Sequence, residues 1–172
     1  YLLDRLKGFE EFILLDLYGP MEEPAYQVEL DKQIRNLPDN ISVNFKGAIP
    51  QHKVAAKLSQ YHGFAMPTLG ENFGHAIFES LAVGKPVLIS DQVNIYREVV
   101  EAQVGGASPA NIVSFTQLMS HWLANGRIRD QAHSRMQAFV SQHYDWRDSI
   151  SRAVGRSKRK SFSACRVQRR PA

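Results

Sequence analysis

The sequence predicts an α/β protein with an open, parallel, Rossmann-like sheet and helices on both faces. Segments with the pattern of a buried strand alternate with segments of helical spacing four times in succession, which favours parallel strands joined by helices. The chain has 172 residues, of which 44% are hydrophobic, enough for the core of one domain. The alternation is too short for an eight-unit barrel, and no internal repeat indicates a solenoid.

The first half of the chain contains two of these units. An amphipathic helix is expected at the start, with its apolar positions at Leu2, Leu3, Leu6 and Phe9. Residues 12–18 are mostly apolar and end at Gly19, which is typical of a buried strand followed by a turn. A helix is expected at residues 26–37, a strand at 41–46 and a helix from Pro50.

The second half begins with two further units and then changes. The expected elements are a strand at 63–66, a turn at 67–70, a helix at 74–83, a strand at 86–90 and a helix at 95–101. Beyond Gly105 and Gly106 the pattern predicts two helices, at 115–125 and 128–143, that pack against one side of the sheet. We expect the aromatic side chains of this region, such as Trp122, to lie in the core.

Other classes of protein do not fit the sequence. No apolar run approaches the roughly 18 residues of a membrane-spanning helix, since Asp16 interrupts even residues 12–17. The single cysteine, Cys165, cannot form an intrachain disulfide or a cysteine zinc site, and the first residues lack the pattern of a secretory signal. The six histidines show no metal-site spacing with carboxylates. We therefore expect a cytoplasmic protein without a metal site.

The last 22 residues form a basic tail. Residues 151–172 hold eight of the 21 Lys and Arg and none of the 17 Asp and Glu, which leaves 13 basic and 17 acidic residues elsewhere, a net charge of −4. The tail has few large apolar side chains, so we expect residues 1–150 to form the domain and 151–172 to be disordered. Its charge would suit an anionic membrane surface, and less so nucleic acid.

Three loops that follow predicted strands contain glycine, at Gly19, at Gly47 and across residues 67–74. In an open parallel sheet, ligands bind outside the carboxyl ends of the strands, where such loops lead into helices. Glycine lets the backbone approach a ligand closely, and a helix that starts near Gly74 favours an anion such as phosphate. For each single loop, a glycine that merely ends a strand is the simpler interpretation.

Two carboxylates distinguish the third loop. Glu71 lies before the predicted helix and Glu79 in its second turn, so the pair would bracket an anion bound at the helix start. Carboxylates repel phosphate and accept hydrogen bonds from hydroxyls, which points to a nucleotide sugar, whose diphosphate has hydroxyls on both sides. The alternative is a helix capping box from Thr68 to Glu71, which Gly70 and Gly74 disfavour.

These residues belong to a segment that resembles a known family. Residues 67–91, PTLGENFGHAIFESLAVGKPVLISD, resemble the E-x7-E segment of retaining GT-B glycosyltransferases of the group 1 (family 4) kind. Residues 43–47, VNFKG, are similar to the family's strand before its base-binding loop, and residues 144–146 resemble it weakly. The similarity extends from residue 10 to about residue 150.

The resemblance implies the carboxyl-terminal, donor-binding half of a GT-B glycosyltransferase of hexosyltransferase type. It places the catalytic Glu71 beside the transferred sugar and Glu79 against the ribose hydroxyls. Gly19 and Gly47 would contact the rest of the nucleotide. The donor-binding backbone groups would come from Asn72, Phe73, Gly74 and His75. The diphosphate would be stabilised by a helix dipole and basic side chains, without a metal.

The sequence also departs from the family pattern. The family has an Arg and a Lys after the first strand of this domain, but Arg5 and Lys7 follow no strand and are interpreted as solvated helix residues. The first strand, the basic pair and the acceptor-binding domain are therefore expected to be missing. The chain begins at Tyr1 and is interpreted as a fragment with little or no activity of its own.

The resemblance further implies a role in polysaccharide or glycolipid biosynthesis, with an acceptor that is lipid-linked and peripheral contact with the inner face of a membrane. Two alternatives remain at this level. One is another GT-B sugar-nucleotide enzyme, such as an epimerase. The other is a non-catalytic module that binds polyanions through the basic tail.

Overall fold

A computed structural model describes residues 12–20, 24–72, 74–125, 133–143 and 162–168. The expected helix at the start, with Arg5 and Lys7, lies outside the described residues. So do Phe73 and residues 144–146.

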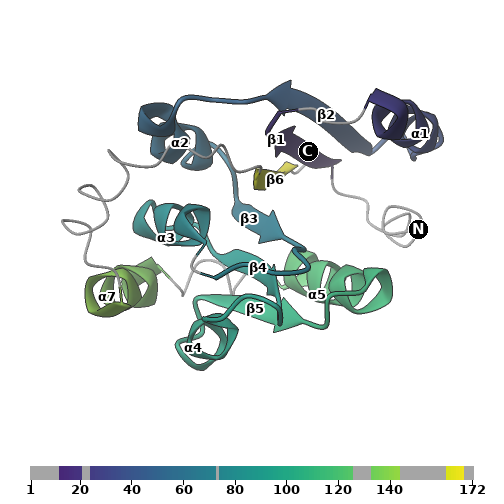
Figure 1. Ribbon diagram of the computed structural model, residues 1–172. Helices are drawn as coiled ribbons and strands as arrows, with labels where there is room; N and C mark the ends of the chain where they lie inside the picture. The colour runs from purple at the N-terminus through teal and green to yellow at the C-terminus, as the bar shows by residue number, and fades with distance from the viewer. Residues whose placement is uncertain (1–11, 21–23, 73, 126–132, 144–161, 169–172) are drawn as a thin grey trace.

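The described strands form one six-stranded sheet (Figure 1). Its members are β1 (Phe12–Tyr18), β2 (Ile41–Gly47), β3 (Gly63–Met66), β4 (Val87–Ser90), β5 (Gly105–Ser108) and β6 (Phe162–Gln168), in the spatial order β2-β1-β6-β3-β4-β5. β1 and β2 are parallel, and so are β3, β4 and β5. Because β6 is antiparallel to both β1 and β3, those two strands run in the same direction.

Helices connect these strands as the alternation predicts. They are α1 (Pro24–Arg35), α2 (Gln51–Leu58), α3 (His75–Ala82), α4 (Tyr96–Glu101), α5 (Ile112–Ala124) and α7 (His133–His143). The four predicted strand and helix units are thus confirmed, with small shifts at their ends. The predicted α/β class with helices on both faces is confirmed as well: Figure 1 shows α1 and α5 on one side of the sheet and α2, α3 and α7 on the other. The expectation that the last two helices pack against the same side was wrong, because α5 and α7 belong to different core layers.

β6 corrects two expectations about the end of the chain. Part of the tail that was expected to be disordered, Phe162–Gln168, lies inside the sheet, and its direction makes the sheet mixed rather than wholly parallel. β6 pairs with seven residues of β1 and three of β3, which are not paired with each other. The basic composition of the tail predicts that its side chains are solvated. Composition does not show that backbone N–H and C=O groups of β1 and β3 need hydrogen-bond partners, which β6 provides. In the doubly wound order 3-2-1-4-5-6, β6 takes the place of strand 1.

β5 is a strand that the sequence did not predict. Its residues Gly105–Ser108 include no large apolar side chain, so they lack the usual strand pattern. The backbone nevertheless pairs with β4 from Val87 to Ser90. A Cβ atom at Gly105 would lie 2.0 Å from the carbonyl oxygen of Val87, so the close packing of these strands requires glycine.

The core has two layers, one on each face of the sheet. Alternate residues of a strand point to opposite faces. Ile13 therefore packs with Trp122 of α5, whereas Tyr18 packs on the other face with Phe78 of α3 and Phe139 of α7. The aromatic residues Trp122 and Phe139 are buried, as expected. Among the described residues, no helix is both long and apolar enough to span a bilayer.

Candidate functional site

The loop between β3 and α3 is the centre of the predicted site. Gly74 has φ +63°, in the left-handed region, and α3 begins at the next residue, His75. A Cβ atom at Gly74 would lie 2.7 Å from Cδ1 of Ile77, so both the backbone angle and the space favour glycine here. No helix runs through residues 68–74 as far as the loop is described, which rules out the alternative that Thr68 and Glu71 form a capping box.

Glu71 is held at the start of α3. Its Oε1 accepts a hydrogen bond from the Gly74 N–H at 3.2 Å. Its backbone joins the loop after β4, because the Glu71 N–H donates to the Gln92 carbonyl and the Glu71 carbonyl accepts from Asn94, both at 3.2 Å. The carboxylate therefore lies at the positive end of the α3 dipole, which favours negative charge.

Glu79 lies in the second turn of α3 and is half-buried. Burial raises the pKa of its carboxyl from the ordinary 4.5 to about 7, and a hydrogen bond from Nε2 of Gln51 to Oε1 lowers it in part. Gln51 is the first residue of α2, directly after the loop that contains Gly47. This contact, which no sequence pattern indicated, connects that loop with α3.

The two other glycine loops also meet. The Gly19 N–H donates to the Gly47 carbonyl at 3.1 Å, and Gly47 has φ +68°. The structure therefore brings Gly19 and Gly47 together at the carboxyl ends of β1 and β2. Asn72 and His75 are exposed beside the start of α3, while Phe73 lies outside the described residues.

This arrangement suits a ligand that combines an anion with hydroxyl groups. The start of α3 provides backbone N–H groups, and Glu71 and Glu79 provide acceptors near it.

Residues 2–138 of the chain match the family model of the glycosyl transferases group 1. The chain belongs to this family.

The solved structures include a similar glycosyltransferase fold. Sucrose-phosphate synthase from Thermosynechococcus elongatus is 21% identical to this chain, with a TM-score of 0.63. The match covers 80% of this chain and 36% of the synthase, so the chain spans about a third of that protein's length. The likeness supports a GT-B, Rossmann-like domain. No curated protein matched the chain.

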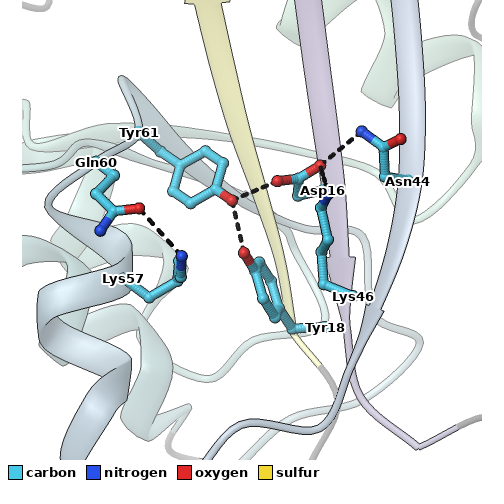
Figure 2. Close-up of polar contacts among 7 residues, drawn as sticks. All are labelled: Asp16, Tyr18, Asn44, Lys46, Lys57, Gln60 and Tyr61. Atoms are coloured by element: carbon cyan, nitrogen blue, oxygen red, sulfur yellow. Dashed lines mark hydrogen bonds and ion pairs between the residues drawn. The ribbon is translucent and has the colours of Figure 1, made fainter.

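A second polar cluster of this glycosyltransferase domain was missed by the sequence analysis. Asp16 in β1 is only 5% exposed, and its Oδ2 accepts a hydrogen bond from the Tyr61 hydroxyl at 2.5 Å (Figure 2). The same hydroxyl is 2.6 Å from that of Tyr18, and Nδ2 of Asn44 donates to Oδ1 of Asp16 at 2.9 Å. Lys46 Nζ lies 3.9 Å from Oδ1.

This cluster contributes to the wall of a cavity of about 400 Å³ between α2 and the sheet. The pKa of Tyr61 and that of Tyr18 are both raised, mainly because burial disfavours the charged form. Both hydroxyls therefore stay protonated at neutral pH. Neither Glu71 nor Glu79 lines the cavity. Asp16 and Tyr61 are 45 residues apart, and the sequence showed Asp16 only as an interruption of an apolar strand.

Proposed function

We propose that this domain binds the nucleotide-diphosphate sugar donor of a retaining glycosyltransferase. The observation that supports this best is the position of Glu71 and Glu79 around the start of α3. A diphosphate suits the N–H groups at that helix start, and the sugar and ribose on either side have hydroxyls that donate to carboxylates. Membership of the group 1 glycosyltransferases supports the same ligand class.

Each part of the site has a role in this proposal. Glu71 lies beside the transferred sugar and acts as the catalytic carboxylate, and Glu79 accepts hydrogen bonds from the ribose. Backbone groups from Asn72 to His75 bind the diphosphate, while the loops at Gly19 and Gly47 contact the remainder of the nucleotide. Binding needs no metal in this scheme, because the helix start stabilises the leaving diphosphate.

The complete reaction requires an acceptor as well. The bond between the anomeric carbon and the diphosphate oxygen breaks, the oxygen of an acceptor hydroxyl bonds to the same face of the sugar, and the hydroxyl proton passes to the departing diphosphate. The chain covers about a third of the synthase that it resembles, which is consistent with a separate acceptor-binding region. We propose that the acceptor is a polysaccharide or glycolipid precursor, used at the cytoplasmic face of a membrane.

Titration calorimetry tests donor binding directly. A thermal-shift screen with UDP, GDP and ADP sugars first identifies the donor. Glu79→Ala is then expected to raise the donor Kd by about tenfold or more, because hydrogen bonds to charged groups contribute about 1.5–3 kcal/mol. The matched control is Glu98→Ala, an exposed residue of α4, which leaves the Kd unchanged. An unchanged Kd in Glu79→Ala contradicts the proposed role of Glu79.

A further inference from the structure

The cavity beneath α2 is a second place where a ligand fits. It is lined by side chains from β1, from the end of β2 and from α2 with the residues that follow it. Its volume of about 400 Å³ lies within the range of small-molecule pockets, and it is far larger than the share of one water molecule. Three residues of its lining, Tyr18, Lys46 and Ile49, adjoin the loops at Gly19 and Gly47 that the donor proposal uses, and the rest of the lining has no part in that proposal.

The floor of the cavity is a fixed polar cluster. Asp16 is buried and accepts from Tyr61 at 2.5 Å and from Asn44 at 2.9 Å, so both carboxylate oxygens have partners. A buried carboxylate is costly, and apolar residues of similar size often give equal or greater stability. Here the carboxylate holds the Tyr61 side chain in place and lies 3.9 Å from Nζ of Lys46.

Two lysines give the cavity its charge. Lys46 lies 3.9 Å from Asp16, beyond hydrogen-bond distance, and its side chain is 44% exposed. Lys57 Nζ donates to Oε1 of Gln60 at 3.1 Å. Each ammonium group has three N–H donors, so both can donate further bonds. With one carboxylate against two ammonium groups, the cavity has a net positive charge and is suited to an anion.

The remaining wall is apolar. Leu14 and Ile49 line the cavity together with the lysines. An inorganic anion would leave most of the 400 Å³ volume unfilled, whereas the body of an organic ligand would pack against these side chains. We propose that this cavity binds a small phosphate monoester, with its phosphate between Lys46 and Lys57 and its organic part against Leu14 and Ile49. Lysine binds phosphate well as a point charge.

The binding test uses NMR titration of the ¹⁵N-labelled chain with glycerol 3-phosphate and with inorganic phosphate, at constant ionic strength set with sodium chloride. Saturable shifts are expected at the amides of Lys46, Lys57 and Tyr61. The double variant Lys46→Gln/Lys57→Gln is expected to raise the Kd by about tenfold or more. Lys53→Gln changes an exposed lysine of α2 that does not line the cavity, and it is expected to leave the Kd unchanged.

Several results would overturn this proposal. Shifts that increase linearly without saturation show nonspecific binding, and so does an equal loss in Lys53→Gln. Equal affinity for inorganic phosphate shows that the organic part of the ligand is not bound. Loss of binding in Glu79→Ala, with the double lysine variant unaffected, places the phosphate in the donor site instead. That last result leaves the proposed donor function intact, so the two proposals fail separately.

Discussion

The Tyr61→Phe substitution tests the polar cluster beneath α2. It removes a hydroxyl that donates to the buried Asp16 at 2.5 Å and lies 2.6 Å from the Tyr18 hydroxyl. A hydrogen bond to a charged group contributes about 1.5–3 kcal/mol and one between neutral groups about 0.5–1.5 kcal/mol. The variant is therefore expected to lose about 2–4 kcal/mol of unfolding free energy, a large part of the roughly 5–15 kcal/mol of an ordinary domain.

Urea unfolding followed by circular dichroism measures this loss. With a slope of about 2 kcal/mol per molar urea, the midpoint is expected to fall by roughly 1–2 M. The control is Tyr96→Phe, which keeps the ring under the guanidinium of Arg97 and changes stability by less than about 0.5 kcal/mol. A loss in Tyr61→Phe no larger than that of the control refutes the assignment of Asp16 as a buried charge stabilised by Tyr61.

Three further predictions concern the loop, Glu79 and the tail. Gly74→Ala forces alanine to φ +63° and places its Cβ atom against Ile77, so urea unfolding should show a loss of about 1–2 kcal/mol of unfolding free energy. An unchanged unfolding free energy would mean that the loop relaxes. Because the Glu79 pKa is raised from 4.5 to about 7 in the folded chain, the native state binds the extra proton between these values. The stability that Glu79 contributes is thus complete below pH 4.5 and lost as the pH rises through 7. The melting temperature of the wild type should therefore fall relative to that of Glu79→Gln as the pH rises from 4.5 through 7, and parallel pH curves would contradict the shift. Deletion of residues 162–172 removes the ten residue pairs of β6 with β1 and β3, so we expect a loss of several kcal/mol of unfolding free energy. An unchanged urea midpoint would show that β6 does not hold the sheet together.

The sequence predicted β1 to β4 well because β1, β3 and β4 are mostly apolar, β2 alternates apolar and polar residues, and each strand ends at glycine, proline or a polar turn. β5 could not be recognised in the same way. Glycine is required at position 105 because a Cβ atom there would lie 2.0 Å from the carbonyl oxygen of Val87. The small residues that permit this close packing have the sequence pattern of a loop. β6 was missed because the basic composition of the tail indicates solvated side chains, whereas strand pairing depends on the backbone of β1 and β3.

Only the part of the candidate site whose residues are close in sequence could be predicted. Glu71 and Glu79 are close in sequence, so a loop and one helix were enough to place them. The contact of Gln51 with Glu79 and that of Tyr61 with Asp16 join residues 28 and 45 positions apart. Such contacts depend on how α2 packs against α3 and the sheet, which periodicity along the chain does not specify.

Hydrogen–deuterium exchange with and without the donor sugar nucleotide tests the central claim most directly. We expect the donor to slow amide exchange at the start of α3, at residues 74–79, and in the loops after β1 and β2, at Gly19, at residues 47–49 and at Gln51. Protection confined to other parts of the chain, with residues 74–79 unchanged at saturating donor, would contradict it.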